Sequence, residues 1–340
     1  MTELSVIVVN FNTRMFLESC LESVQPAAGG LTTEVIVVDN ASTDGSNPWI
    51  RTHHPSVILL SNAANLGFSA GVNQGLGVAH GRFLLVLNPD IILQPGSLQP
   101  LVAYLEAHPE IGAIMPELVG ADGSVQREYL RKLPSLGQVL LFCTALERWA
   151  RNRPSLVARF RDDLGGNEPI REVQQIPGAF VLTSRAVVEV VGWFDVRFKL
   201  FFEDVDWSHR VRRAGYKLVL HRGVRALHAG GSSMKGEVGD WMRGRFALSL
   251  MTYYDLHCGW FSSLLVKAII ILNSVTVLLA RTMQLPFSRQ DRDQCRSGQR
   301  QHLYLLRSAV ETYLFHRSVP LTPSLQRLPV VESDAMRDGE

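Results

Sequence analysis

Two short acidic clusters in this sequence contain residue types that could perform chemistry. Asn88-Pro89-Asp90 closes the apolar run of residues 83–87, and Glu203-Asp204-Val205-Asp206 follows the aromatic run of residues 198–202. A carboxylate after a buried parallel strand lies where open α/β sheets bind their ligands, and Mg²⁺ and Mn²⁺ prefer carboxylate and phosphate oxygens. Aromatic neighbours exclude water from the second cluster, which favours a catalytic carboxylate there. A metal-binding acid and a separate base together indicate transfer of a group from an activated donor.

Each cluster also has a purely structural interpretation, which the residues alone leave open. Asn-Pro-Asp is an ordinary turn sequence, and the second cluster could cap a helix and pair Asp206 with Arg210 one turn later. His228 could add an imidazole ligand to a metal, but a single histidine in a predicted loop is more often structural or solvent-exposed. The elements that position these side chains therefore have to be considered next.

Apolar runs alternate with helical stretches along the chain. Strands are expected at residues 5–9, 34–38, 57–60, 83–87, 111–115 and 178–182, and helices at residues 15–24, 70–79, 96–107, 185–191 and 204–214. Strands separated by helices of this length predict right-handed βαβ units. The predicted fold class is α/β, a Rossmann-like and mostly parallel sheet flanked by helices, with a loop-plus-helix insertion at residues 127–167 and a C-terminal helical extension.

Polar residues follow the first two predicted strands. Asn10 ends the first strand, and Asp39-Asn40-Ala41-Ser42-Thr43-Asp44 follows the second. An acid in this place can bind a ribose hydroxyl or a base N–H, although the same residues form turns and Asp44 could cap a helix. Residues 65–73 precede a helix, and Gly67 there permits close approach of backbone to a phosphate. No Gly-x-Gly-x-x-Gly follows the first strand, which argues against a nicotinamide dehydrogenase.

Residues 260–281 form an apolar stretch long enough for a helix that crosses a bilayer core. Ser263, Lys267, Ser274 and Arg281 recur at spacings of four and seven and form one narrow polar stripe. The stripe favours an amphipathic helix, lying in a membrane interface or against a partner, over a true span. Arginines crowd the same region and could face anionic lipid headgroups: Arg281, Arg289, Arg292, Arg296, Arg300 and Arg307.

Bulk composition excludes some classes of protein. The chain has 340 residues, of which 46% are hydrophobic and 19% charged, and its net charge of +2 does not indicate a nucleic-acid binder. Four cysteines (Cys20, Cys143, Cys258 and Cys295) show no metal-ligand spacing and favour a reducing compartment. A strand-like run begins directly after residue 3, so no signal peptide is expected. We expect a cytoplasmic protein, peripheral at the inner face of the cell membrane.

The combined motifs resemble glycosyltransferase family 2, with the GT-A fold, and most closely its bacterial rhamnosyltransferase-like branch. The resemblance covers residues 3–235 and rests on the segments 6–12, 37–46, 65–75, 87–90, 177–180, 192–195 and 201–210 together with His228. One departure is Asn88, which replaces the first acid of the family's Asp-x-Asp motif, as in the rhamnosyltransferase-like branch. One fewer negative charge leaves the metal identity, Mg²⁺ or Mn²⁺, open.

The resemblance implies an inverting transferase that uses a nucleoside-diphosphate sugar, with dTDP-rhamnose favoured, and a cell-envelope glycan or lipid-linked acceptor. It assigns Asp204 as the catalytic base and Asp90 with His228 as metal ligands. The residues implied in donor binding are Asn10, Asp39, Asn40, Ser42, Asp44, Asn65, Gly67, Phe68, Asn73, Asn88 and Asp90, and those implied in support of the acceptor or active site are Gly178, Glu203, Trp207 and Arg210. The expected organisation is a catalytic domain at 1–235, a membrane-associated helical region at 236–320 and a disordered tail at 321–340, in a possible homo-oligomer.

Two other classes remain open on the sequence. A nucleotidyltransferase that makes sugar nucleotides would share the sheet and the metal acid, but usually has a glycine-rich, basic loop after the first strand, which is absent here. A non-catalytic, membrane-associated binding protein on the same fold would not need Asp90, Asp204 and His228 together. Release of nucleoside diphosphate rather than pyrophosphate separates these classes.

Overall fold

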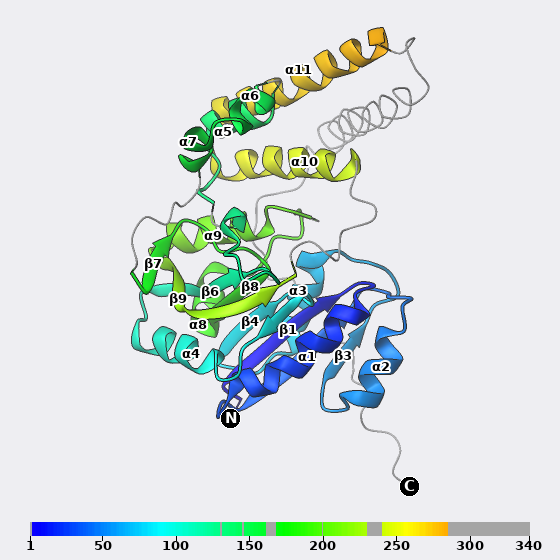
Figure 1. The fold of residues 1–340 in the computed structure, drawn as a ribbon, viewed down its shortest axis with the longest axis vertical. Helices are drawn as coiled ribbons and strands as arrows, with labels where there is room; N and C mark the ends of the chain where they lie inside the picture. Colours follow the sequence, from blue (N-terminus) through cyan, green and yellow to red (C-terminus); the bar gives the residue numbers. More distant parts are fainter. Residues whose placement is uncertain are drawn as a thin grey trace.

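The computed structural model describes residues 2–129, 131–144, 146–160, 168–198, 200–229 and 240–284. An α/β body occupies one end of the molecule and a group of helices the other (Figure 1). The body contains strands β1 (Leu4–Asn10), β2 (Thr33–Asp39), β3 (Ile58–Ser61), β4 (Phe83–Leu87), β5 (Ile91–Leu93), β6 (Ile111–Val119), β7 (Ile170–Val173), β8 (Phe180–Ser184) and β9 (Lys217–His228). Its helices are α1 (Arg14–Ala28), α2 (Ser46–His53), α3 (Phe68–Val78), α4 (Leu98–Ala107), α8 (Arg185–Val191) and α9 (Glu203–Arg213).

The helical group contains α5 (Leu136–Phe142), α6 (Glu147–Arg151), α7 (Pro154–Ala158), α10 (Asp240–His257) and α11 (Trp260–Gln284). A short 3₁₀ helix, η1 (Arg127–Tyr129), leads towards it. Helix α10 lies between the body and α11 (Figure 1), α5 contacts α11, and α6 contacts α5 and α7. The helical group is therefore joined to the body through α10.

The strands form one mixed sheet in the order β3-β2-β1-β4-β8-β6-β9-β5, with β7 added on β9. Strands β3, β2, β1 and β4 are mutually parallel, and β6 is parallel to β9. Strands β8, β5 and β7 run antiparallel to their neighbours. The predicted α/β class is confirmed. Because β1, β2 and β4 are parallel, Asn10, Asp39 and Asn88 follow or end strands at one edge of the sheet.

Close helix packing explains why β1 is apolar along its whole length. All seven residues of β1 are buried, as expected for a parallel strand covered on both faces. On one side α1 buries Leu17, Cys20, Leu21 and Val24, which recur at helical spacing. In α3, a Cβ added at Gly75 would lie 2.5 Å from Ile7 Cγ2, so only glycine lets this helix lie so close to β1.

A second, smaller core lies under the helical group. It joins Val139 of α5, the aromatic residues Phe198 and Phe202 that precede α9, and apolar residues of α10 and α11. The buried members from α10 and α11 are Ala247, Leu250, Met251, Tyr253, Tyr254, Val266 and Ile270. The segment that opens α9 is thus packed from outside the sheet.

The structure also corrects the sequence analysis. Strands β5, β7 and β9 and helix α2 were not predicted, whereas α10 lies within the region 236–320 that was predicted to be helical. His228 was predicted to lie in a loop, but it is the last residue of the long strand β9. Polar residues interrupt the apolar pattern of β9 where its register to β6 shifts, between Pro116 and Glu117. The insertion at 127–167 contains η1 and the short helices α5 to α7, whereas residues 285–340, with the predicted tail, lie outside the described residues.

Candidate active site

The polar residues after β1 and β2 form a closed hydrogen-bond network around Asp39. Asn10 pairs with Asp39 in the β1–β2 register, and its Nδ2 donates to Asp39 Oδ1 at 2.7 Å and to Ser42 Oγ at 3.0 Å. The backbone N–H of Ser42 donates to Asp39 Oδ2 at 2.9 Å. Asp39 and Asn10 are fully buried. The structure therefore brings together three of the residues predicted to bind the donor, with the Asp39 carboxylate held rigidly.

Asp44 lies in the same turn and connects two helix starts. Its Oδ2 accepts from the Arg14 backbone N–H at 2.8 Å, and its Oδ1 accepts from the Ser46 backbone N–H at 3.1 Å. Burial raises the pKa of this carboxyl, but the hydrogen bonds from Ser46 and Arg14 outweigh it and hold the pKa below the usual range. The capping interpretation of Asp44 is therefore the one with direct contacts, and its role towards a nucleotide stays a prediction.

The loop before α3 is held against the turn after β2. Asn65 Oδ1 accepts from the Gly67 N–H at 2.9 Å, and Asn40 Nδ2 donates to the Gly67 carbonyl at 3.1 Å. Gly67 has φ +87°, a conformation that favours glycine. One turn into α3, Asn73 Nδ2 donates to the Phe194 carbonyl at 2.9 Å, so this residue supports the loop before α9.

Asp90 and His228 meet at the junction of β4, β5 and β9. Ile91 and His228 are partners in the β5–β9 register, and the Ala229 N–H donates to the Asp90 carbonyl at 3.0 Å. His228 Nε2 lies 3.6 Å from Asp90 Oδ1, and both side chains are buried. The structure thus brings together the two predicted metal ligands, although they lie far apart in the chain.

Gln126 fixes the orientation of the His228 ring. Its Nε2 donates to the His228 carbonyl at 2.9 Å, so its Oε1 faces His228 Nδ1 at 2.7 Å and accepts the Nδ1 proton. Tyr129 packs edge-on against the imidazole, with ring centroids 4.9 Å apart. Ligating histidines characteristically donate their second ring nitrogen in this way. Sequence reasoning missed Gln126, because nothing in the sequence connects it with His228.

A divalent cation fits this donor set. With the proton on Nδ1, His228 presents the Nε2 lone pair beside the Asp90 carboxylate, at a separation longer than a hydrogen bond. No cluster of three or more His, Cys, Asp or Glu side chains suited to a metal occurs among the described residues. One carboxylate and one imidazole are compatible with an ion that takes its other ligands from substrate phosphate and water. Asp90 and His228 are the residues that would hold it.

Asp204 is the second residue of α9, and its carboxylate faces the segment that leads into β8. Its Oδ2 accepts from the Gly178 backbone N–H at 2.8 Å, and its Oδ1 accepts from the Val205 N–H at 2.8 Å. A Cβ added at Gly178 would lie 3.3 Å from the Phe68 ring, so a side chain there would crowd the start of α3. Burial raises the pKa of Asp204, and these two hydrogen bonds with the charge of Arg131 oppose the rise.

Segment 178–179 connects the two acid sites. The Gly178 N–H binds Asp204, while the Ala179 carbonyl accepts from the Asn88 N–H at 2.9 Å. Asp204 is therefore hydrogen-bonded to Gly178, and the turn that contains Asp90 is hydrogen-bonded to the next residue, Ala179. The predicted base and the predicted metal-binding acid therefore lie around one short backbone segment.

Glu203 is buried beside Asp204 and differs from it electrostatically. Its Oε2 has no hydrogen-bond partner among the described residues. Burial, and then the charge of Asp204, raise the pKa of Glu203 to about 8. Glu203 therefore favours its protonated form near neutral pH, whereas Asp204 accepts two backbone hydrogen bonds that favour its carboxylate form.

Trp207 and Arg210 lie behind the site on α9. Trp207 is fully buried and its indole N–H donates to the Gly192 carbonyl at 3.0 Å. Arg210 pairs with Asp206 at 2.7 Å and donates to the Val191 and Trp193 carbonyls. Both side chains anchor α9 to the loop after α8. The structural interpretation of the Asp206–Arg210 pair is thus confirmed, and a contact with an acceptor stays a prediction.

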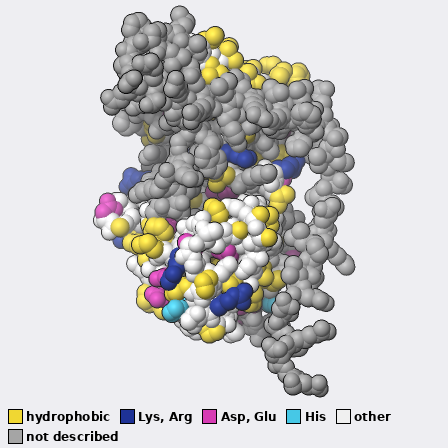
Figure 2. Space-filling model, turned by 90° about the vertical axis from the view of Figure 1, so that its right-hand side faces the viewer, with side chains coloured by type: hydrophobic (Ala, Val, Ile, Leu, Met, Phe, Trp, Pro, Cys, Tyr) yellow, Lys and Arg dark blue, Asp and Glu magenta, His cyan; other side chains and the backbone are white. Residues whose placement is uncertain are grey.

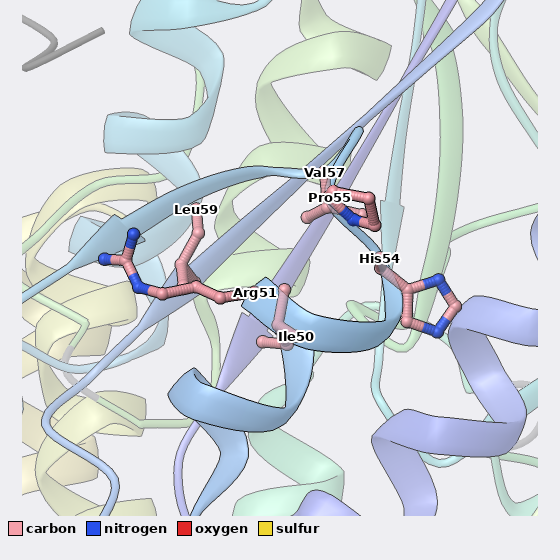
Figure 3. Close-up of a pocket in the computed structure, with 6 residues that line it drawn as sticks. All are labelled: Ile50, Arg51, His54, Pro55, Val57 and Leu59. Atoms are coloured by element: carbon pink, nitrogen blue, oxygen red, sulfur yellow. The ribbon is translucent and has the colours of Figure 1, made fainter. Parts of the chain in front are cut away.

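A shallow depression of about 280 Å³ lies away from these acids, between α2 and the edge strand β3. It is lined by Ile50, Arg51, His54, Pro55, Val57 and Leu59. Figure 3 shows the Arg51 guanidinium and the His54 ring pointing to opposite sides. Because its polar groups do not converge, this depression is a poor candidate for the active site.

A mixed α/β sheet with the predicted base, the predicted metal-binding acid and a polar turn at one edge is the arrangement expected of a group-transfer enzyme. The profile of Glycosyl transferase family 2 matches residues 5–163. An N-acetylglucosaminyl-diphospho-decaprenol L-rhamnosyltransferase of Mycobacterium tuberculosis is 30% identical over 268 residues, which cover 76% of this chain and 86% of that protein. The chain belongs to glycosyltransferase family 2, and it is a glycosyltransferase.

Two further proteins show lower similarity to this chain. A low-salt glycan biosynthesis hexosyltransferase of Haloferax volcanii is 21% identical, over 66% of this chain and 67% of that protein. Among solved structures, a mannosyltransferase of Pyrobaculum calidifontis in complex with GDP-Man and Mn²⁺ is 18% identical, with coverage of 93% and 88% and a TM-score of 0.48. A likeness of this size carries no argument about the ligands of this chain.

Proposed function

We propose that this glycosyltransferase moves rhamnose, with inversion, from dTDP-rhamnose to a hydroxyl of a lipid-linked cell-envelope acceptor. The geometric observation that carries the transfer is the placement of Asp204 and the Asp90 turn on either side of residues 178–179. The choice of sugar and acceptor is supported by the name of the mycobacterial relative, most of whose length this chain covers.

The chemistry follows from the two acids. An acceptor hydroxyl loses its proton to the Asp204 carboxylate while its oxygen attacks the anomeric carbon. The bond from that carbon to the diphosphate oxygen breaks, and the electron pair leaves with the nucleoside diphosphate. Attack from the face opposite the leaving group gives inversion and requires no nucleophile from the enzyme. Asp90 and His228 would hold a divalent ion, which would stabilise negative charge on the diphosphate when bound.

The donor site is assigned to the polar turn around Asp39. The Asp39 carboxylate, fixed by Asn10 and Ser42, is suited to a ribose hydroxyl or a base N–H. The start of α3 lies next to it through the contact of Asn40 with Gly67, and a helix start offers backbone N–H groups to phosphate.

The test is a donor screen with the full chain. dTDP-rhamnose, UDP-glucose, UDP-galactose and UDP-N-acetylglucosamine are each combined with Mg²⁺ or Mn²⁺ and a short-chain prenyl-diphospho-N-acetylglucosamine. We expect dTDP release and a product heavier by one deoxyhexose with dTDP-rhamnose alone. Turnover of another donor would refute the choice of rhamnose. Release of pyrophosphate would identify a nucleotidyltransferase, and binding without any turnover would identify a non-catalytic protein.

We also propose that α11 binds the membrane surface from the cytoplasmic side. By length and composition residues Trp260–Leu279 could cross a bilayer, with a mean hydropathy of 2.0. However, the polar residues Ser263 and Ser274 are buried and hydrogen-bonded within the protein, while many apolar side chains of this helix are exposed. The exposed apolar residues of α11 are Trp260, Phe261, Leu264, Leu265, Ile271, Leu272, Val275 and Leu279. Hydrophobic side chains also gather at this upper end of the molecule in Figure 2.

Such a one-sided apolar face is suited to the headgroup boundary of a lipid surface. Leu140 of α5 and Trp149 of α6 are also exposed, and α5 contacts α11, so they extend the same surface. Flotation with anionic and neutral liposomes tests this, with Leu272→Asp as the disrupting variant. Val190→Asp is the matched control, because Val190 is an exposed apolar residue of α8 in the body. Equal flotation of both variants would refute the proposed membrane-binding surface. Retention of the protein in membranes washed with carbonate would favour a helix that crosses the bilayer.

A further inference from the structure

Helix α10 closes over the segment that leads into the catalytic helix α9. Phe201 and Phe202 both have left-handed backbone conformations, with φ of 64° and 70°. Such conformations are unfavourable for bulky residues and persist only where the surrounding structure holds them. The ring of Phe246 from α10 lies 6.0 Å from that of Phe201 and 5.1 Å from that of Phe202. Packing from α10 therefore holds the two strained residues directly before Glu203 and Asp204.

Hydrogen bonds from α10 fix the same segment. Ser249 Oγ donates to the Leu200 carbonyl at 2.9 Å. One turn further along α10, Tyr253 packs against Phe202 with ring centroids 5.8 Å apart, and its hydroxyl lies 2.7 Å from His209 Nδ1 on α9. Burial, and then the charge of His257, lower the pKa of His209 to about 4. The ring is therefore neutral, and its Nδ1 accepts a hydrogen bond from the Tyr253 hydroxyl.

The end of α10 contributes a buried polar contact to α9. His257 Nε2 lies 2.6 Å from Asp206 Oδ1, while Arg210 binds the other carboxylate oxygen at 2.7 Å. The His257 side chain is 7% exposed and that of Asp206 is 2% exposed. The His257 ring also stacks on His209, with centroids 4.3 Å apart. Asp206 follows Asp204 by only two residues, so a shift of Asp206 moves the base.

We infer that His257 and Tyr253 of α10 are positioning residues for Asp204, which holds only if Asp204 is the base. They touch neither the predicted donor site nor the Asp90 site. They act through Asp206, His209 and Phe202, all of which lie within the segment that carries Asp204. The helix that adjoins α11 thereby sets the angle at which the base meets the Gly178 N–H and the acceptor. The helical group is part of the catalytic machinery as well as a docking surface.

The experiment compares His257→Ala with His257→Gln. The glutamine amide nitrogen can occupy the place of Nε2 and donate to Asp206, whereas alanine leaves Asp206 Oδ1 without this partner. Glu172→Gln is the matched control, because it removes an exposed ion pair of α9, with Arg212. We expect His257→Ala to lower kcat by about 10–100-fold, since a displacement of about 1 Å can cost this much, and to leave the donor KM unchanged. His257→Gln should restore most of kcat, and Glu172→Gln should behave as wild type.

Hydrogen exchange at the Gly178 amide is the second readout, because this N–H is bonded to Asp204. We expect exchange to accelerate in His257→Ala and to return to the wild-type rate in His257→Gln. If His257→Ala fails to fold, Tyr253→Phe, which removes only the hydroxyl, is measured in the same way and should show the same changes to a smaller degree.

The outcomes separate this inference from the proposed function. Wild-type kcat and Gly178 exchange in His257→Ala would overturn the positioning role, as would equal losses in the alanine and glutamine variants. Full activity of Asp204→Asn would instead overturn the assignment of the base. Gly178 exchange decides the positioning role even if none of the tested donors is turned over.

Discussion

Asp90 and Asp204 are held in place by two different kinds of structure. Asp90 lies between β4 and β5, where backbone hydrogen bonds to residue 229 and the β5–β9 register fix it. Asp204 lies in the first turn of α9, which follows two strained residues, and side chains of α10 hold that start. Backbone ladders tolerate most side-chain changes, whereas side-chain packing does not. The predicted metal site should therefore be robust to distant substitutions, and the predicted base should be sensitive to them.

Removing the carboxylate of Asp90 should have the largest effect. Asp90→Ala leaves His228 as the only predicted protein ligand, so we expect both turnover and metal-dependent binding of dTDP to be lost. Calorimetry of dTDP with and without Mn²⁺ measures this. Equal enhancement by Mn²⁺ in the variant and in wild type would show that Asp90 does not hold the metal.

Replacing Asp204 by Asn should affect only the chemical step. The amide keeps the shape of the side chain but cannot accept a proton, which typically costs about 10²–10⁴ in rate. The affinity for dTDP should survive, in contrast to Asp90→Ala. Steady-state turnover with calorimetry distinguishes the two variants. Turnover close to wild type would mean that another group is the base.

Gln126→Leu sharpens the comparison, because it leaves both candidate ligands in place. Loss of the Gln126 acceptor frees the His228 ring to rotate and change tautomer. Outer hydrogen-bond partners of this kind typically contribute about 10–100-fold in metal affinity. Titration of Mn²⁺ in the presence of dTDP measures the change. Gln174→Leu, which alters an amide bonded to the Leu133 N–H instead, is the control and should retain wild-type affinity.

Glu203→Gln should have the smallest effect of these substitutions, and we expect the effect on the pH dependence of the free energy of unfolding. The pKa of Glu203 is about 8 in the folded chain against an ordinary 4.5. The folded state therefore keeps its proton while the unfolded state loses it, so this group's contribution to stability is complete below pH 4.5 and is lost as pH rises towards 8. Each pH unit contributes at most about 1.4 kcal/mol, and we expect a total of about 2 kcal/mol because water relaxes around the carboxylate.

Urea unfolding of Glu203→Gln and wild type across that pH range checks the sign. The variant should gain stability relative to wild type as pH rises. A constant difference between the two proteins would contradict the raised pKa of Glu203.

The N-terminal half of the fold could be predicted because its signals are local. Apolar runs such as residues 83–87 are buried strands, and Asp39 and Asp90 follow strands by their place in the sequence. Helix α9 was also recognisable from its acidic start and from Gly215 after its end. The pairing of Asp206 with Arg210 followed from helical spacing.

The remainder of the site depends on contacts that leave no local pattern. Gln126 and His257 act through single hydrogen bonds to residues far away in the chain. Helix α10 spreads its apolar and polar residues around its circumference, so it has no amphipathic face to detect. Strand β9 is interrupted by a bulge next to polar residues. The strained backbone at Phe201 and Phe202 results from packing and has no counterpart in residue type.

The short strand β5 limits where this chain can change in length. It is three residues long, and its pairing of Ile91 with His228 keeps the imidazole on the same side as Asp90. Side chains alternate between the two faces of a strand, so a shift of one residue would turn His228 away. A single insertion or deletion between Arg225 and His228 should therefore abolish the metal pair. The exposed turn at Asp122 and Gly123 should accept extra residues freely.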